Sequence, residues 1–325
     1  MVAHMHHLVL IDGHHLMYRA YWAIPRTLKT AKGEQTNAVF GVASMLLTIL
    51  SAEEPGALVF CIDAGDETFR HQEAEGYKEG RAETPDDFYA QIPRVLACVS
   101  AFGFPVVSDA KYEADDFLCA YARAAEAAGD RVTIVTGDRD ALQIASANIR
   151  IAIPHKGYGA AEYLGPREIE GKYGVRPDQV VPYKGLTGDA SDNLPGVRGI
   201  GPKTAAELLQ SYGTLEGVYA HLADIRPAVR AKLEHDREQA FFCAHMAELV
   251  CDMPLPVSLR DAGVSHLDSR RIAAFFREME FTLLLKRLQS LVQSPYGRRV
   301  FIEEGQEWAA QEGGAPLVRS QMMLF

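Results

Sequence analysis

The sequence predicts an α/β fold built around a mainly parallel sheet, and two observations carry this prediction. Short apolar runs rich in Val and Ile alternate along the chain with longer segments of helical periodicity. The three clearest runs each lead into an aspartate, as expected for strands that are covered on both faces and end at the edge of a sheet. Regular alternation of strand and helix favours a parallel sheet with crossover helices.

Each element follows from its own pattern. The predicted central strands are LVLID ending at Asp12, ALVFCID ending at Asp63 and RVTIVTGD ending at Asp138. IRIAI at 149–153 could add a further strand. The helical patterns lie at about 36–52, 86–102 and 114–128.

Composition limits the kind of protein. The chain has 325 residues, 48% apolar and 23% charged, which is ordinary for a globular protein and enough for two lobes. We find no run of about 18 apolar residues, which a membrane helix would need, and no apolar signal core at the start. The five cysteines are odd in number and form no C-x-x-C pair, so we expect reduced thiols and no zinc site.

Acidic residues gather where the predicted strands end. Ligands of open α/β sheets bind beyond the carboxyl ends of the strands, so aspartates from three strands would converge on one rim. A single such aspartate would be only a helix cap or a turn former, but YEADD, GDRD and TGDASDN add further acids. The nine candidate metal ligands are Asp12, Asp63, Glu113, Asp115, Asp116, Asp138, Asp140, Asp189 and Asp192.

These acids predict bound cations. Nine carboxylates cannot stay ionised close together without positive charge. Oxygen ligands without His or Cys favour Mg²⁺ or Mn²⁺, and two such ions about 4 Å apart would stabilise the attacking and leaving oxygens of a phosphoryl transfer. The formal net charge of −10 argues at first against nucleic acid, but without these nine the other acids nearly balance the 33 bases. The charge therefore does not exclude DNA as a partner.

A glycine-rich turn follows the last two aspartates. LPGVRGIGPKTAAELLQSYG predicts a turn, a tight hairpin and a helix that begins at Pro202 and ends at Gly213. Because the turn does not follow a strand, a dinucleotide site is not favoured. Free N–H groups at a helix start suit the phosphates of a nucleic-acid backbone. The candidate contacts are Gly196, Gly199, Gly201, Lys203 and Thr204.

The segment 64–85 is a further candidate site. At about 20 residues it is long for a connection in a compact domain. Its interleaved aromatic and basic residues suit a single-stranded nucleic acid, although a plain surface loop would look similar. Together with the segment after Asp12, it supplies the candidate DNA contacts Tyr18, Arg19, Tyr21, Arg70, Tyr77, Lys78 and Arg81.

Five motifs, in this order, resemble the 5′-nuclease domain of bacterial DNA polymerase I and the related flap endonucleases and phage 5′ exonucleases. They are DGHHLMYRAYWA, FRHQEAEGYKEGRAETP, YEADD, TGDRDALQI and TGDASDNLPGVRGIGPKTA. The resemblance runs from about residue 6 to EFTLLLKRL at 280–288. It implies a PIN-like, Rossmann-like nuclease core with a helical arch, and a mainly helical region with a helix-hairpin-helix that binds DNA.

The resemblance also implies an activity and roles for residues. Members of the family use Mg²⁺ or Mn²⁺ to cut branched DNA near the junction of a 5′ flap. Asp12, Asp63, Glu113 and Asp115 resemble the ligands of the first metal, with Asp116 adjoining, and Asp138, Asp140, Asp189 and Asp192 resemble the second group. Lys78 and Arg81 resemble the basic residues of the arch, which would act in catalysis beside Asp12 and Asp63. The glycine turn resembles the helix-hairpin-helix, which often holds a K⁺ ion.

We expect three parts in the chain. They are a nuclease core at 6–182 with the arch at about 64–85, a helix-hairpin-helix region at 183–290, and a C-terminal extension at 291–325. Because no polymerase follows, we expect a stand-alone monomeric nuclease of the bacterial cytoplasm that serves primer removal and DNA repair. The final QMMLF resembles the peptide by which bacterial replication proteins bind the sliding clamp, with Gln321, Leu324 and Phe325 as contacts.

Two other functions stay open as alternatives. A PIN-type single-strand ribonuclease has a similar core and acidic rim, but it lacks the glycine hairpin and the long arch. A DNA-junction binding protein without catalysis would need no metal, yet all nine acids are present. Calcium binding by DASDN is not supported, because the ligand spacing of a calcium loop is missing.

Overall fold

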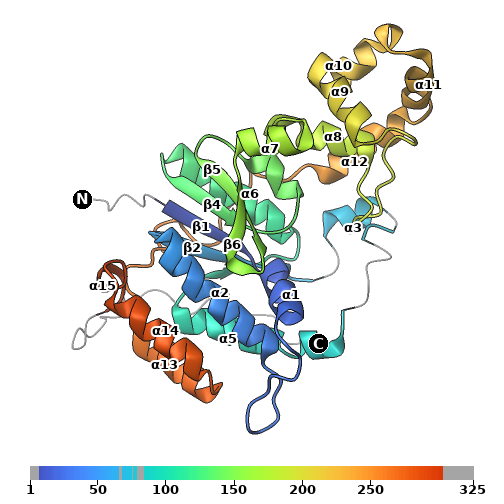
Figure 1. Ribbon diagram of the computed structural model, residues 1–325. Helices are drawn as coiled ribbons and strands as arrows, with labels where there is room; N and C mark the ends of the chain where they lie inside the picture. Colours follow the sequence, from blue (N-terminus) through green and yellow to red (C-terminus); the bar gives the residue numbers. More distant parts are fainter. Residues whose placement is uncertain (1–6, 66–67, 75, 79–83, 303–325) are drawn as a thin grey trace.

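A mainly parallel sheet lies at the centre of the computed structural model, which describes residues 7–65, 68–74, 76–78 and 84–302 (Figure 1). The six strands have the order β3-β2-β1-β4-β5-β6, and only β6 runs antiparallel to its neighbour. The strands are β1 (His7–Asp12), β2 (Ala57–Cys61), β3 (Val106–Val107), β4 (Arg131–Val135), β5 (Ile149–His155) and β6 (Gly157–Leu164). The predicted α/β fold class is confirmed.

The strands predicted from apolar runs are the inner ones. β1, β2 and β4 are almost wholly buried, because helices cover both faces of the sheet, and their sequences are therefore apolar throughout. The two edge strands escape prediction from the sequence. β3 has only two residues, and β6 (GYGAAEYL) is partly exposed and carries no apolar run.

Helices cover both faces of the sheet. Side chains alternate along β1, so Val9 and Ile11 pack on one face while Leu8 and Leu10 pack on the other. The first face meets α1, α2, α5, α13 and α14, and the second meets α6 and the chain at 249–262. These helices and the short α15 are α1 (Gly13–Ala23), α2 (Asn37–Glu53), α5 (Ile92–Phe102), α6 (Ala114–Ala127), α13 (Ser269–Glu278), α14 (Thr282–Gln293) and α15 (Gly297–Val300).

The helix predicted over 86–102 is divided in two. A short helix, α4 (Asp86–Tyr89), ends before α5 begins, and Pro93 lies in the first turn of α5. Proline has no N–H to donate, so it is tolerated in a first turn but would remove a hydrogen bond from the middle of a longer helix. The helices predicted at 36–52 and 114–128 match α2 and α6 to within a residue.

A second group of helices stands apart from the sheet, at the upper right of Figure 1. It has its own hydrophobic cluster, which includes Leu186, Ile200, Leu209 and Val218. The helices of this region are α8 (Val180–Thr187), α9 (Pro202–Tyr212), α10 (Leu215–Ala220), α11 (Pro227–His235) and α12 (Arg237–Ala247). The preceding helix, α7 (Pro166–Tyr173), packs against the sheet through Ile169. The helix predicted to begin at Pro202 and end at Gly213 is α9.

The end of the described chain returns to the core. The hydroxyl of Tyr296 donates to the carbonyl of Pro55 at 3.0 Å, and Phe301 is buried. The helices α13 to α15 therefore pack with the sheet and not with the second group of helices. The predicted clamp contacts Gln321, Leu324 and Phe325 lie outside the described residues.

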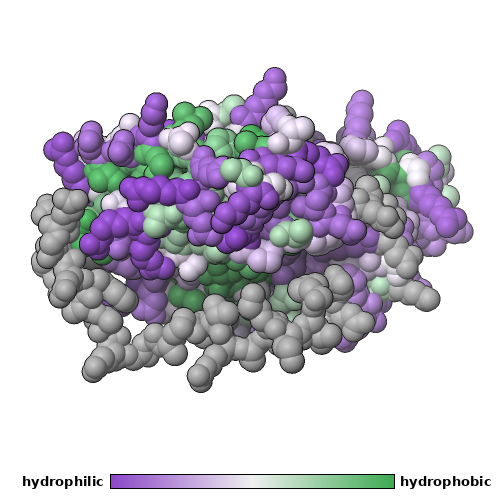
Figure 2. Space-filling view, turned by 90° about the horizontal axis from the view of Figure 1, so that it is seen from below, coloured by the Kyte–Doolittle hydropathy of each residue, from purple (hydrophilic) through white to green (hydrophobic). Residues whose placement is uncertain are grey.

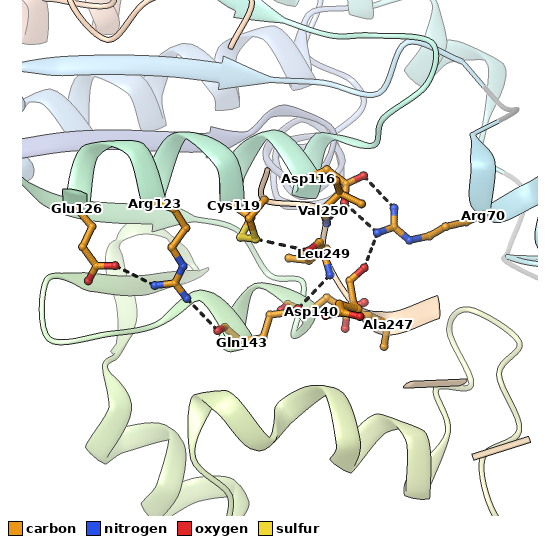
Figure 3. Close-up of a disulfide and its surroundings, with 12 residues drawn as sticks. Arg70, Asp116, Cys119, Arg123, Glu126, Asp140, Gln143, Ala247, Leu249 and Val250 are labelled. Atoms are coloured by element: carbon orange, nitrogen blue, oxygen red, sulfur yellow. Dashed lines mark hydrogen bonds and ion pairs between the residues drawn. A yellow bond between two sulfur atoms is a disulfide. The ribbon is translucent and has the colours of Figure 1, made fainter. Parts of the chain in front are cut away.

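A disulfide joins Cys119 of α6 to Cys251, with 5.0 Å between their Cα atoms (Figure 3). This pair contradicts the prediction that all five cysteines are reduced. The two residues are 132 positions apart, so no local spacing indicates their pairing. The other three cysteines, Cys61, Cys98 and Cys243, are free and buried.

Most of the described surface is polar where Figure 2 shows it. Seen from below the view of Figure 1, hydrophilic residues predominate and hydrophobic ones form smaller areas between them. Across the part of the chain with described structure, no helix is both long enough and apolar enough to cross a membrane.

Candidate metal centre

The parallel strands bring aspartates to one rim of the sheet. Asp12 is the last residue of β1, and Asp63 and Asp138 follow β2 and β4 closely. The first turn of α6 brings Asp115 to the same place, since the amide of Ala114 donates to Asp63 Oδ1 at 2.7 Å. The carboxylates of these four residues repel one another. We call Asp12, Asp63, Asp115 and Asp138 the rim cluster.

Burial and mutual repulsion shift the pKa values within the rim cluster. Burial, and then the nearby carboxylates, raise the pKa of Asp12 to about 7, although the amide of His15 and the hydroxyl of Thr136 donate hydrogen bonds to it. The same causes, burial first, raise the pKa of Asp115 well above its usual value. Asp115 Oδ1 is buried and has no hydrogen-bond partner among the described residues. A bound cation would satisfy such an oxygen.

Asp140 and Asp189 form a second acidic group around one lysine. Lys184 lies near the end of α8, is 8% exposed, and pairs through Nζ with Asp189 Oδ2 at 2.6 Å and with Asp140. Burial raises the pKa of Asp189, but the charge of Lys184 and hydrogen bonds from Lys184 and Ser191 outweigh it and bring the pKa down to about 2. Asp192 is buried on the turn that follows.

Asp138 lies between the two predicted groups of ligands. Its carboxylate interacts with those of Asp12 and Asp115. The amide of Asp140 donates to Asp138 Oδ1 at 2.9 Å, which ties the two groups together. Extended-strand spacing suggests that neighbouring acids share one direction, but the chain turns into a short 3-10 helix, η1 (Asp140–Ile144), at this point.

Glu113 and Asp116 are neutralised by a buried arginine. The Nη1 and Nη2 atoms of Arg70 donate to the two carboxylate oxygens of Asp116 at 3.0 and 2.9 Å (Figure 3). Nη1 also donates to Glu113 at 3.2 Å. The same guanidinium donates to the carbonyls of Met246 and Glu248. With both oxygens of Asp116 used in this way, this side chain holds α6 to the neighbouring chain, and its expected place beside the first metal is not supported by the structure.

Three predicted DNA contacts are buried. Arg70 is 1% exposed, Tyr21 is 0% exposed and Tyr77 is 7% exposed, so burial contradicts a surface role for each. The hydroxyl of Tyr21 donates to Asp87 at 2.6 Å inside the protein. Interleaved aromatic and basic residues in the sequence do not reveal which of them point inward.

Tyr18 is exposed, and Lys78 lies beside the rim cluster. Tyr18 is 41% exposed, and the neighbouring Arg19 reaches a backbone carbonyl at the end of β5 with a 3.0 Å hydrogen bond. Lys78 Nζ lies 2.9 Å from Glu113 Oε1, which puts its ammonium group beside the rim cluster. Arg81 lies outside the described residues.

The glycine turn has a backbone shape that only glycine allows. Gly196 has a φ of 61°, and a Cβ there would lie 2.2 Å from the backbone nitrogen of Gly188. Gly199 also has a positive φ, and its carbonyl accepts a 2.9 Å hydrogen bond from Lys232 Nζ. A K⁺ ion bound to this carbonyl would compete with Lys232.

The turn leads into an open helix start. Gly201 is the N-cap of α9, makes no side-chain cap, and has open space around its Cα. Lys203 is exposed and Thr204 is half-buried beside it. Uncapped N–H groups next to a lysine form a surface suited to a phosphate group.

The acids fit divalent cations in chemistry but are not yet gathered around one point. Within the described ranges, no three His, Cys, Asp or Glu side chains lie close enough together to hold a metal ion. Like charges hold the carboxylates apart, and Arg70, Lys78 and Lys184 neutralise several of them. The unpartnered oxygen of Asp115 indicates that the rim still lacks positive charge, which a divalent ion with oxygen ligands would supply.

Sequence reasoning missed two side chains that organise the acids. Lys184 meets Asp140 from a distant part of the chain, and no motif marks it. Thr136 donates to Asp12 Oδ2 at 2.7 Å and accepts from the amide of Asp138 at 3.0 Å. Its place between a buried strand and GD was a usable signal, because such a hydroxyl lies at the same rim as the strand-end acids.

Comparisons with known proteins cover most of the chain. A model of the N-terminal resolvase-like domain of 5′-3′ exonucleases matches residues 7–174, and a model of their C-terminal SAM fold matches residues 175–270. DNA polymerase I of Deinococcus radiodurans is 45% identical over 253 residues, which are 77% of this chain and 26% of that protein. The thermostable DNA polymerase I of Thermus aquaticus is 39% identical over 306 residues, 94% of this chain and 35% of that protein. The chain thus spans about a quarter to a third of these relatives.

Solved structures share the fold at low identity. A bacteriophage T5 flap endonuclease, in a pseudo-enzyme-product complex with DNA and metal ions, superimposes with a TM-score of 0.64 at 17% identity, covering 89% of this chain and 100% of that one. The catalytic core of Rad2 bound to DNA gives 0.56 at 15% identity, covering 89% and 92%. Human GEN1 with Holliday junction DNA gives 0.53 at 15% identity, covering 86% and 71%.

Proposed function

The chain belongs to the 5′-3′ exonuclease family, and from this premise we propose that it is a metal-dependent nuclease that cuts DNA at the junction of a 5′ flap and removes nucleotides from 5′ ends. The observation that carries the proposal is the rim cluster, in which carboxylates from three strand ends and the start of α6 lie near one another and one buried oxygen has no partner among the residues described. Such a site would bind cations. Because the chain belongs to an exonuclease family, we expect these cations to serve the hydrolysis of phosphodiester bonds.

The carboxylates divide into two candidate binding positions. Asp12, Asp63, Asp115 and Asp138 would hold one ion of Mg²⁺ or Mn²⁺, with Glu113 beside them, and Asp140, Asp189 and Asp192 would hold a second. Ions bound there would supply positive charge to the attacking and leaving oxygens of phosphodiester hydrolysis.

Other residues of this chain would place the DNA. The ammonium group of Lys78, next to Glu113, would donate to a phosphate at the rim. The start of α9, with Gly201, Lys203 and Thr204, would bind phosphates of the duplex without regard to sequence. The exposed ring of Tyr18 would stack on an unpaired base.

A panel of labelled substrates tests this function. Flapped, nicked and single-stranded DNA and single-stranded RNA are incubated with Mg²⁺, Mn²⁺ or EDTA. We expect cleavage at the flap junction that requires a divalent ion, and a loss of roughly 100-fold or more in turnover for Asp115→Asn with little change in DNA affinity. Asp178→Asn is the matched control, because Asp178 is exposed and pairs only with Arg176 among the described residues.

Four outcomes would contradict the proposal. Cleavage that persists in EDTA would show that the reaction needs no divalent ion. Full turnover by Asp115→Asn would show that the rim cluster does not take part in the reaction. Preferred cleavage of single-stranded RNA would instead favour the PIN-type ribonuclease. Binding of flapped DNA with no cleavage by any ion would favour a junction-binding protein.

A second part of the proposal concerns a partner and rests on the sequence of the C-terminus. Gln321, Leu324 and Phe325 would bind the apolar pocket of a bacterial sliding clamp, with two adjacent apolar side chains as anchors. Calorimetry with a clamp protein compares the intact chain with Leu324→Ala/Phe325→Ala. Equal affinity of the two proteins would reject these residues as the contact, and no binding by either would reject the clamp as a partner.

A further inference from the structure

Lys184 lies where the second group of acids needs a cation. Its Nζ pairs with Asp189 Oδ2 at 2.6 Å and also with Asp140, and the side chain is almost wholly buried. Asp189 is close to it in sequence, but Asp140 comes from the 3-10 helix η1, which follows the inner strand β4. One ammonium group therefore holds together two carboxylates from the two halves of the molecule.

Asp12 and Asp115 of the rim cluster have no such partner. Among the residues described, no ion pair joins either carboxylate to a lysine or arginine, and Asp115 Oδ1 has no hydrogen-bond partner. Nearby basic side chains pair with neighbouring acids instead, since Lys78 pairs with Glu113 and His14 Nδ1 lies 3.6 Å from Asp63 Oδ2. The second group of acids therefore already has a buried positive charge between its carboxylates, whereas Asp12 and Asp115 do not.

An ammonium group and a divalent ion cannot use the same carboxylate oxygens together. Lysine carries a compact positive charge with three donors, which satisfies oxygen lone pairs much as an ion does. In a poorly solvated site, two cations a few ångströms apart repel each other strongly. An ion that binds Asp140 and Asp189 must therefore displace Lys184 from them.

We propose that Lys184 is a built-in competitor of the second metal ion. Without metal, it neutralises Asp140 and Asp189 and keeps them together. It also lowers the affinity of this position for a divalent ion, so the rim cluster fills first and the second position fills at higher metal concentration. This inference rests on the proposed function, because it assumes that both groups of acids hold metal.

Metal binding to the intact protein tests the competition directly. Calorimetric titration with Mn²⁺ at neutral pH compares the wild type with Lys184→Met and Lys184→Gln, which remove the charge and differ in polarity. We expect the weaker class of Mn²⁺ sites to bind more tightly in both variants, on the order of tenfold. Lys172→Met is the matched control, since it removes an exposed lysine that pairs with Glu162, and its isotherm should equal that of the wild type.

A purely structural role for Lys184 predicts the opposite sign. If the lysine only positions the carboxylates, its loss should weaken the second Mn²⁺ site, and that result, or an unchanged affinity, would overturn the proposal. Circular dichroism without metal checks that each variant is folded.

A measurement on the wild type keeps the test valid if both variants fail to fold. In ¹⁵N-labelled protein, the ammonium signal of Lys184, assigned by its loss in Lys184→Arg, should be protected from exchange without metal. It should lose this protection only as Mg²⁺ fills the weaker sites, and protection that survives saturation would reject displacement.

The assay separates this inference from the function on which it rests. If the wild type binds no Mn²⁺ and cleaves no flapped DNA, the proposed function is wrong. If the wild type cleaves with Mn²⁺ but Lys184→Met and Lys184→Gln bind Mn²⁺ no more tightly, only the proposed role of Lys184 is wrong.

Discussion

Arg70 holds Asp116 through two parallel hydrogen bonds, of 3.0 and 2.9 Å, at a point where both side chains are buried. The same guanidinium donates to two carbonyls in the chain that follows α12. A predicted surface contact is therefore an internal connection between the segment after β2, the start of α6 and the chain beyond α12. The bidentate geometry gives this connection a fixed orientation.

The first prediction is a large loss of stability in Arg70→Ala. Removing the guanidinium leaves Asp116 buried without its charge partner, which should lower the free energy of unfolding by about 3–5 kcal/mol. Urea denaturation measures the change. Arg176→Ala, which breaks the exposed pair with Asp178, should cost less than about 1 kcal/mol. Equal effects of the two substitutions would show that the buried pair has no special role.

The second prediction concerns pH in the absence of metal. Burial, with help from other carboxylates, raises the pKa of Asp12 from 3.8 to about 7, so the folded protein holds a proton that the unfolded chain has lost. The resulting stabilisation is complete below about pH 4 and is lost as the pH rises through about 7, at roughly 1.4 kcal/mol for each unit of pKa shift.

Thermal unfolding between pH 5 and pH 8 in EDTA measures this loss. The melting temperature should fall with rising pH in the wild type and fall less in Asp12→Asn, in which Asp115 still has a raised pKa. Mg²⁺ should raise the melting temperature most at the high end of the range, because the carboxylates are ionised there. A melting temperature that rises with pH in EDTA would contradict the assignment.

The third prediction concerns Lys78. Lys78→Ala should slow single-turnover cleavage of flapped DNA by roughly 100-fold, because the ammonium group lies beside Glu113 at the rim. Its affinity for duplex DNA should change far less. Lys78 lies over the ring of Tyr77, and Lys111 lies over the ring of Tyr112 in the same way. Lys111→Ala therefore serves as the control. If Lys78→Ala weakens affinity and leaves the cleavage rate intact, this lysine is a plain phosphate contact.

The fourth prediction separates two glycines of the same turn. Gly196→Ala should destabilise the protein by about 1–3 kcal/mol, because a Cβ at this position would lie 2.2 Å from a backbone nitrogen and φ is 61°. Gly201→Ala should cost about 1 kcal/mol at most, since no atom lies within 4 Å of its added Cβ and only the weaker N-cap preference of alanine acts against it. It should nevertheless weaken binding to every duplex substrate by a similar factor, as fluorescence anisotropy would show. Weaker binding to only one DNA sequence would contradict a grip on the backbone.

The sequence correctly predicted the strands that are buried along their whole length. β1, β2 and β4 are buried on both faces, so their apolar runs are unbroken and their terminal aspartates stand out. β6 lies at the edge of the sheet, where exposed and buried residues mix without strict alternation. Periodicity is lost in such a strand, and the sequence alone does not separate it from a loop.

The residue types at the site were easier to predict than their partners. Carboxylates at strand ends follow from the chain order, and eight of the nine candidates still have a place in the proposed centre. Tyr21, Arg70 and Tyr77 have the composition of a DNA-binding loop, yet each is buried against other parts of the chain. Which way a side chain points, and which lysine meets which acid, depends on contacts between segments that are distant in sequence, as with Lys184 and Asp140.

The disulfide between Cys119 and Cys251 closes a ring over 132 positions of the chain. The ring includes Asp138, Asp140, Asp189 and Asp192, whereas Asp12, Asp63 and Asp115 lie before it. A protease that cuts once inside the ring would therefore not release either part of the acidic site. The nicked protein should migrate as one band in denaturing electrophoresis without a reducing agent and as two bands with it, so the cleaved molecule would stay covalently whole until its thiols are reduced.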